Sequence, residues 1–333
     1  MRPAAFLRLL TFAVCGGLLL GGCAGDEEPA ATSPDRASSA TTTPDDSAPV
    51  IDQDFPDPDV LQVGDTYYAY ATQTGNGARN VQVATSEDLQ TWQVERIDAL
   101  PELPEWATNG RTWAPDVAAV DGGYVMYLTA HSVDPDVQCI GVAASSDPMG
   151  PFEPVGTKPL VCPAAAGGAI DAASYVEPDG VRYLLWKNDG NCCGKDTWLH
   201  LQRLSADGLR TAGPPRRLVK QDQPWEGNLV EAPTLVRHGS SYVLLYSAND
   251  YGGESYTTGY AVASDLTGRY VKGDEPLMTT DSVGVTGPGG QDVVTTPAGD
   301  SYVVFHGWDP AVIYRGMYLR PLTWKGDRPV VAD

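Results

Sequence analysis

The chain has 333 residues, of which 42% are hydrophobic, and it carries 16 Tyr and 8 Trp against only 5 Phe. A chain of this size and composition can bury a large core in one or two domains, which excludes a wholly disordered protein. The formal net charge of −21 argues against a nucleic-acid-binding protein, because phosphate recognition needs clustered Lys and Arg. We therefore expect a neutral or cationic partner.

The first 22 residues have the pattern of an export signal. Arg2 and Arg8 come before a short apolar run that ends in "LGGC" and is too short to span a membrane as a helix. This ending resembles the bacterial lipoprotein box, in which the cysteine, here Cys23, becomes the lipidated N-terminus. We expect residues 1–22 to be a lipoprotein signal peptide, and the mature protein to be extracellular and held on the cell membrane by its lipid alone.

Residues 23–49 predict a tether between the lipidated cysteine and the folded part. They consist mainly of Ser, Thr, Ala, Pro and Asp and show no apolar periodicity. Such a composition cannot bury enough apolar surface to offset the entropy lost on folding, so we expect this segment to be disordered.

Four cysteines remain beyond the tether, and export permits them to form disulfides. The simplest pairing joins Cys139 to Cys162. It leaves the adjacent Cys192 and Cys193 as a vicinal bridge or as free thiols. Zinc binding is the alternative, and it is disfavoured because no His lies at a zinc-ligand spacing from "NCCG".

A hairpin pattern repeats along residues 50–333. Its five copies are "VGDTYYAYAT", "VDGGYVMYLTA", "EPDGVRYLLWK", "RHGSSYVLLYS" and "PAGDSYVVFHG", and their tyrosines at 67, 124, 183, 242 and 302 recur every 57 to 60 residues. A second strand–turn–strand pattern follows in "VATSEDLQTW", "VAASSDPMGPF" and "VASDLTGRY". Four short strands per repeat predict an all-β, single-domain, five-bladed β-propeller, with a pair of β-sandwiches as the alternative.

Acidic or amide residues recur about ten positions before each hairpin tyrosine, where the innermost strand of a blade begins. They are Asp57, Asp116, Asp171, Glu231 and then Gln291 or Asp292. Any one of them could be a solvated strand end or a turn cap. Glu231 differs because it lies in the apolar run "LVEAPTLV", where burying an ionised carboxylate is costly.

Carboxylates that face one central cavity favour glycoside hydrolysis, in which one acid protonates the leaving oxygen and one base activates water. A ring of metal ligands is the chief alternative, and it requires equivalent acids. These acids are not equivalent, because Asp57 lies in the polar Asp/Pro loop "DFPDPDV" and Glu231 in an apolar strand. Unlike surroundings push pKa values apart and thereby separate acid from base.

The motifs "DFPDPDV…GDTYYAYAT", "WAPDV", "AIDAASYVEPDGVRYLLWK", "VEAPTLVRHGSSYVLLYSAN" and "GPGGQDVV…GDSYVVFHGW" resemble, in this order, glycoside hydrolase family 43. The resemblance covers the chain from about Val50 onward. It implies that Asp57 is the general base, that Glu231 is the general acid, and that Asp171 orients the acid and raises its affinity for a proton. It also implies an inverting mechanism, with the carboxyl groups of base and acid roughly 6.5–9.5 Å apart.

The resemblance implies further contacts. Asp116, Gln291 and Arg315 are expected to contact the substrate, and Trp113 and Trp186 to stack on a sugar face unless they belong to the core. His306 matches a histidine near the propeller axis, which can lie beside calcium or another cation or can be simply structural. The family often has "GPGH" where this chain has "GPGG", a departure that bears on that cation site. The loop "WKNDGNCCGKDT" is expected to border the channel.

The features "AID", "VEAP", "CIGVA" and "NDGN" favour an α-L-arabinofuranosidase or arabinanase acting on plant cell-wall polysaccharide or its oligosaccharides. A β-xylosidase of the same family is the first alternative. The second is a glycan-binding surface lipoprotein without turnover. We expect a monomer that requires no cofactor and that binds arabinose- or xylose-containing carbohydrate but no nucleic acid. The axis leaves room for a structural calcium or other cation, whose presence the sequence does not decide.

Overall fold

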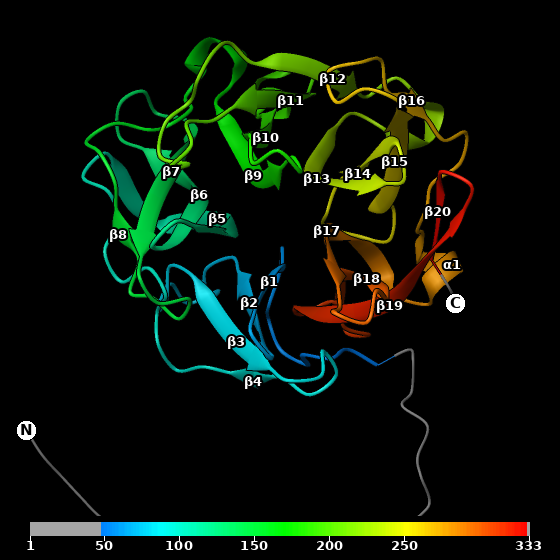
Figure 1. Cartoon of the computed structure of the whole chain (residues 1–333), viewed down its shortest axis with the longest axis horizontal. Helices are drawn as coiled ribbons and strands as arrows, with labels where there is room; N and C mark the ends of the chain where they lie inside the picture. The colour runs from blue at the N-terminus through cyan, green and yellow to red at the C-terminus, as the bar shows by residue number, and fades with distance from the viewer. Residues whose placement is uncertain (1–47, 332–333) are drawn as a thin grey trace, which may run out of the picture. The chain divides into compact units, whose positions relative to one another are not determined.

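The computed structural model describes residues 48–331, which form a propeller of five blades around a central axis (Figure 1). The predicted signal peptide, the lipidation of Cys23 and nearly all of the predicted tether lie outside these residues. Within 48–331, no helix combines the length and apolar character needed to cross a bilayer.

Each blade is one antiparallel sheet of four strands that follow one another in sequence. Blade I holds β1 (Asp59–Val63), β2 (Thr66–Ala71), β3 (Gln82–Ser86) and β4 (Gln93–Val94). Blade II holds β5 (Ala107–Val120), β6 (Gly123–Ser132), β7 (Gln138–Ser145) and β8 (Glu153–Pro154). Blade III holds β9 (Ala169–Val176), β10 (Arg182–Asn188), β11 (Trp198–Arg203) and β12 (Arg216–Lys220).

Blade IV holds β13 (Val230–His238), β14 (Ser241–Ala248), β15 (Thr257–Ala263) and β16 (Val271–Lys272). Blade V holds β17 (Thr286–Thr295), β18 (Ser301–Trp308), β19 (Arg315–Lys325) and β20 (Arg328–Val331). Short helical turns lie between strands, namely η1 (Ala164–Ala166), η2 (Gly190–Cys193), η3 (Pro224–Glu226) and α1 (Thr280–Val283).

The repeated hairpins are the first and second strands of the five blades, and each hairpin tyrosine lies near the start of the second strand. The predicted propeller is therefore confirmed, and the pair of β-sandwiches is excluded. Apolar clusters fill the space between neighbouring blades. One cluster joins Tyr70 and Val83 of blade I to Met126 and Leu128 of blade II.

The predicted disulfide between Cys139 and Cys162 is present, and it ties β7 to the segment before η1. Cys192 and Cys193 are exposed free thiols in η2, and their sulfur atoms lie 2.9 Å apart.

The ring closes between the two ends of the propeller. The amide of Val50 donates to the carbonyl of Met317 in β19, and the amide of Met317 donates to Ile51, at 2.8 and 3.1 Å. The amide of Phe55 donates to the carbonyl of Arg315 at 2.9 Å. The chain thus pairs with blade V before it enters blade I. Only Pro56 lies between Phe55, the last residue of this seam, and Asp57 at the axis.

A second set of contacts repeats at the axis. One residue in or just before each innermost strand has a left-handed backbone: Asp57, Ala114, Asp171, Ala232 and Gly290, with φ between 41° and 55°. The amides of four of them donate to a side chain of the preceding blade's second strand or the residue after it: Ala114 to Thr72, Asp171 to Thr129, Gly290 to Ser247 and Asp57 to His306. The fifth, Ala232, donates to the carboxylate of Asp171 instead.

These contacts correct the predicted alignment of the acids. Asp57 and Asp171 occupy the left-handed position itself, whereas Glu231 lies one residue before it and Asp116 two residues after it. Asp59 and Asp292 share the position of Asp116. The acids therefore do not recur at one structural position but at three. Bulges within the innermost strands β5, β13 and β17 send successive side chains in different directions.

The segment that leads to β13 is held by a buried ion cluster. Glu226 of η3 is fully buried, and its carboxylate accepts bonds from Lys272 Nζ at 2.6 and 2.8 Å and from the Tyr246 hydroxyl at 2.8 Å. The amides of Asp222 and Gln223 also donate to it. Every lone-pair direction of this carboxylate is therefore used, which is the condition for a stable buried charge.

Replacing Lys272 by Met should destabilise the fold by about 3–5 kcal/mol, because it leaves the charge of Glu226 buried without its cation. Urea unfolding monitored by tryptophan fluorescence measures the change. The matched control is Lys220→Met, since Lys220 pairs with Asp196 at the surface and its loss should cost about 1 kcal/mol or less. Equal losses in the two variants would contradict the role given to the cluster.

Candidate active site

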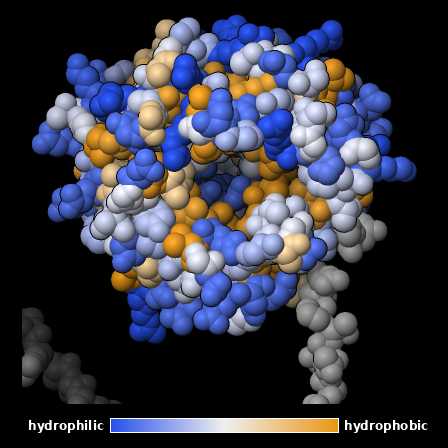
Figure 2. Space-filling model, in the orientation of Figure 1, coloured by the Kyte–Doolittle hydropathy of each residue, from blue (hydrophilic) through white to orange (hydrophobic). Residues whose placement is uncertain are grey.

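A cavity of about 410 Å³ lies where the innermost strands of the five blades approach the axis. The space-filling view shows a hollow at the centre of the face, with hydrophilic residues inside it (Figure 2). Its acidic lining residues are Asp57, Asp59, Asp116, Asp171, Asp189, Glu231, Asp250 and Asp292. The three carboxylates singled out by the family resemblance therefore face one cavity, although they come from blades I, III and IV.

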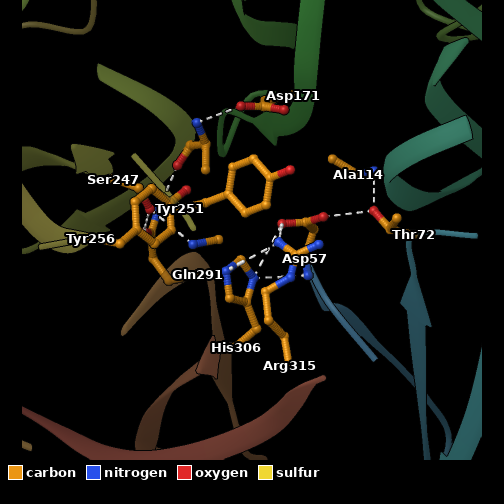
Figure 3. Close-up of polar contacts among 12 residues, drawn as sticks. Asp57, Thr72, Ala114, Asp171, Ser247, Tyr251, Tyr256, Gln291, His306 and Arg315 are labelled. Carbon is orange, nitrogen blue, oxygen red and sulfur yellow. Dashed lines mark hydrogen bonds and ion pairs between the residues drawn. The ribbon is translucent and has the colours of Figure 1, made fainter. Parts of the chain in front are cut away.

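Asp57 is held by contacts on both sides (Figure 3). The Thr72 hydroxyl donates to its Oδ2 at 2.6 Å, its own amide donates to His306 Nδ1 at 3.1 Å, and Arg315 Nη1 lies 3.6 Å from its Oδ1. Burial alone would raise the pKa of Asp57, but the positive charge of Arg315 and the contacts with His306 outweigh burial and hold the pKa well below its ordinary value. Asp57 is thus an ionised carboxylate.

Glu231 lies in a different environment, and both of its oxygens have donors. Lys187 Nζ is 2.9 Å from Oε2, and the Tyr256 hydroxyl is 2.9 Å from Oε1. The side chain of Lys187 is only 1% exposed and that of Glu231 12%. This buried ion pair replaces the purely apolar surroundings that the sequence run predicted for Glu231.

Asp171 fixes the backbone beside Glu231. Its Oδ2 accepts the amide of Ala232 at 2.9 Å, and its own amide donates to the Thr129 hydroxyl at 3.1 Å. Burial first, and then the negative charge of Glu231, raise the pKa of Asp171 to about 8. Near neutral pH Asp171 therefore retains its proton, so the two neighbouring carboxyl groups do not both carry a charge.

Asp116 also lines the cavity. Its Oδ2 accepts the amide of Ser174 in the next blade at 2.9 Å, while its buried Oδ1 has no protein partner. Asp59 and Asp292 make the same contact to Val117 and Val60. Burial raises the pKa of Asp116 to about 7.

Gln291 lines the cavity, but its amide group is engaged within the protein. Its Oε1 accepts the Ser247 hydroxyl at 2.9 Å, and its Nε2 donates to the carbonyl of Ala232 at 2.6 Å. Gln291 thus joins blade V to blade IV, which leaves little of its hydrogen-bonding capacity for a substrate.

Trp113 and Arg315 line the cavity as expected, whereas Trp186 does not. Trp186 is 3% exposed and packs in the core, where its ring stacks on His200 with 4.0 Å between centroids. It points away from the cavity because its neighbour in β10, Lys187, takes the inward position. The prediction that Trp186 stacks on a sugar is therefore wrong.

His306 is fully buried, and both of its ring nitrogens have neighbours. Nδ1 faces Asp57, Nε2 lies 3.4 Å from Arg315 Nη1, and the ring stacks on Tyr256. A cation at Nε2 would meet the positive guanidinium, so these residues do not fit the predicted metal contact. Across residues 48–331, no group of three or more His, Cys, Asp or Glu is arranged to hold a metal ion.

The departure "GPGG" has a physical reason in this chain. Gly290 has φ of 55°, and a Cβ there would lie 2.5 Å from the His306 ring and 2.8 Å from Asp57 Oδ1. Only glycine fits at this point, because the histidine ring and the carboxylate of Asp57 occupy the space that a side chain would need.

Sequence reasoning missed several residues that line or support the cavity. Lys187 and Tyr256 hold Glu231, Thr72 holds Asp57, and Tyr251 lies beneath the Arg315 guanidinium at 4.9 Å. Lys187 carried a readable signal, because a lysine directly follows the apolar run "YLLW" in a predicted strand. The predicted bordering loop is confirmed, since Asp189, Asn191 and Cys192 line the cavity.

An ionised carboxylate and a second acidic group in unlike surroundings, facing one cavity, form the arrangement that glycoside hydrolysis uses. The family model described as "Glycosyl hydrolases family 43" matches residues 47–329. The chain therefore belongs to glycosyl hydrolase family 43, and it is a glycoside hydrolase.

Individual relatives are distant. The chain is 28% identical to "Beta-D-galactofuranosidase xynD" of Aspergillus niger, over 80% of this chain and 78% of that one. It is 24% identical to "Extracellular endo-alpha-(1->5)-L-arabinanase 1" of Bacillus subtilis, over 76% and 80%. The crystal structure of "a thermostable family-43 glycoside hydrolase" superposes with a TM-score of 0.74 at 28% identity, covering 84% of this chain and 93% of that one.

The raised pKa of Asp116 predicts a pH-dependent stability. The folded state keeps a proton on Asp116 that the unfolded chain releases near pH 3.8, so the free energy of unfolding should fall as pH rises from about 4 to about 7. Asp116→Asn should reduce this slope by up to about 1.4 kcal/mol per pH unit. Urea unfolding at pH 5 and pH 7 measures it.

The control for this experiment is Glu102→Gln, which changes an exposed side chain and should leave the slope as it is in the wild type. An unchanged slope in Asp116→Asn would mean that Asp116 is already ionised in the folded protein.

Proposed function

We propose that this protein hydrolyses glycosidic bonds with inversion of configuration, with Asp57 as general base and Glu231 as general acid. The observation that carries the proposal is that these two carboxyl groups face one cavity in different surroundings. Asp57 is kept ionised by Arg315, whereas Glu231 lies beside Asp171, which retains its proton near neutral pH.

In the proposed reaction Asp57 takes a proton from a water molecule, and the water oxygen forms a bond to the anomeric carbon. The bond from this carbon to the glycosidic oxygen breaks on the opposite face. Glu231 delivers to the departing oxygen the proton that the Asp171–Glu231 pair holds. Asp171 orients Glu231 by holding the amide of Ala232, the next residue in the chain. Asp116, Trp113 and Arg315 would contact the sugar from the cavity wall.

We propose arabinose-containing oligosaccharides or polysaccharides as substrates. The sequence features around Asp171 and Glu231 favour this class, and the Bacillus subtilis relative is named an arabinanase. The Aspergillus niger relative is named a galactofuranosidase, so furanosides of galactose belong in any substrate panel. β-Xylosides remain the first alternative class, and a glycan-binding protein without turnover the second.

We also propose that the protein is exported, lipidated at Cys23 and tethered outside the cell as a monomer. The signal pattern supports this, as does the word "extracellular" in the name of the Bacillus subtilis relative. No cofactor enters the proposed reaction.

Asp57→Asn should lower turnover by about 10²- to 10⁴-fold while sugar affinity is retained, because it removes the group that activates water and keeps the shape of the cavity. The assay uses p-nitrophenyl α-L-arabinofuranoside, β-D-xyloside and β-D-galactofuranoside together with arabinan and arabinoxylan. Proton NMR of the first sugar released reports whether its configuration is inverted.

Asp54→Asn is the matched control, because Asp54 shares the "DFPDPDV" loop but does not line the cavity. It should retain turnover. If the wild type binds these sugars but hydrolyses none of them, the glycan-binding alternative replaces the enzyme. Retention of configuration in the released sugar would rule out the roles given to Asp57 and Glu231.

A further inference from the structure

Lys187 occupies a position that the fold fills differently in the other four blades. Strand pairing places it opposite Ile170, the residue before left-handed Asp171. The same pairing places Thr129 opposite Trp113, Ser247 opposite Glu231 and His306 opposite Gly289, each before a left-handed residue. In blade I the amide of Thr72 donates to Pro56, the residue before Asp57.

The residues at this position accept the amide of the next blade, and a lysine ammonium has no lone pair with which to do so. In blade III, Asp171 accepts the amide of Ala232 instead. The fold therefore does not require a lysine here. Burying an ammonium costs several kcal/mol unless it is paired, so its presence at 1% exposure indicates a task other than folding.

The ammonium of Lys187 points at the carboxyl cluster. It lies 2.9 Å from Glu231 Oε2 and 3.7 Å from Asp189 Oδ1. Burial alone would lower the pKa of Lys187, but the negative charges of Glu231, Asp171 and Asp189 outweigh burial and raise it, so the ammonium stays charged. A fixed positive charge at this distance favours the ionised form of a neighbouring carboxyl group.

We infer that Lys187 is a positioning residue for the reaction proposed above: it holds Glu231 through Oε2 and sets the pH range in which the Asp171–Glu231 pair releases its proton. The Tyr256 hydroxyl holds the other oxygen, so the carboxyl group is fixed at both ends. The inference rests on the proposed function only in calling Glu231 the acid. The effect on the protons of the pair does not depend on turnover.

Other titratable groups and one arginine surround the pair. Asp189 follows β10, Tyr256 precedes β15, and across the cavity lie Asp57, His306 and Arg315. Of these, Asp57 is ionised and faces Arg315 at 3.6 Å, so their charges largely offset each other. Lys187 is the cation in direct contact with Glu231, and its removal should therefore dominate any change in the titration of the pair.

The test uses Lys187→Thr, which installs the residue that blade II has at this position, in Thr129, and which the fold therefore accommodates. Carbon-13 NMR of side-chain carboxyl labels follows the titration of the pair, with Glu231→Gln and Asp171→Asn used for assignment. We expect the titration to move upward by about 1 to 3 pH units, because the neighbouring cation is lost.

The activity arm follows kcat/KM against pH. In Lys187→Thr the decline on the basic side should move upward by a similar amount, and kcat should fall more for an unactivated oligosaccharide than for a p-nitrophenyl glycoside, whose leaving group needs less protonation. Lys187→Arg keeps the positive charge and should keep the wild-type pH profile on its basic side. Lys195→Thr removes an exposed cation from the loop that follows β10 and should change neither readout.

The outcomes separate the two ideas. If the NMR titration moves and the wild type hydrolyses no glycoside, the electrostatic role of Lys187 holds and the proposed function fails. If the wild type is active but the titration and the pH profile of Lys187→Thr match it, Lys187 is a structural residue and the inference is overturned. A shift of the same size in Lys195→Thr would also overturn it, because it would show a general charge effect.

Discussion

The arrangement at the axis depends on one repeated interaction. In each blade a residue is held in the left-handed conformation, and its amide is tied to a side chain of the blade before it. Such backbone conformations are costly for residues other than glycine and persist only where the surroundings enforce them. Two of the five left-handed residues are Asp57 and Asp171, so the contact that fixes one blade against the next also aims the carboxyl groups.

The cavity is divided electrostatically. On one side Arg315 and His306 stabilise the negative charge of Asp57. On the other side Lys187 and Asp171 lie beside Glu231. Tyr256 links the two sides, since its hydroxyl donates to Glu231 and its ring stacks on His306. Asp57 and Glu231 therefore have different charged neighbours within one small cavity: Arg315 lies by Asp57, and Lys187 lies by Glu231.

The sequence carried the architecture well because the hairpins repeat at a nearly constant spacing, and local turn chemistry is enough to define them. The sequence also predicted correctly that Asp57, Asp171 and Glu231 face one cavity. Predictions were wrong where they depended on the direction of a side chain. A bulge shifts Glu231 and Asp116 out of alignment with Asp57, and Trp186 and Lys187 point to opposite sides of β10, neither of which a composition pattern reveals.

The seam between the last blade and the start of the first has a consequence for how this molecule matures. Asp57 lies two residues beyond Phe55, whose amide is bonded to β19 of blade V. A chain that has assembled blades III and IV already holds Asp171, Lys187 and Glu231 together. It lacks a fixed Asp57 opposite them until the C-terminal blade has docked. The complete constellation therefore forms only when the whole circle has assembled, so an unfinished molecule would hold half of its reaction centre.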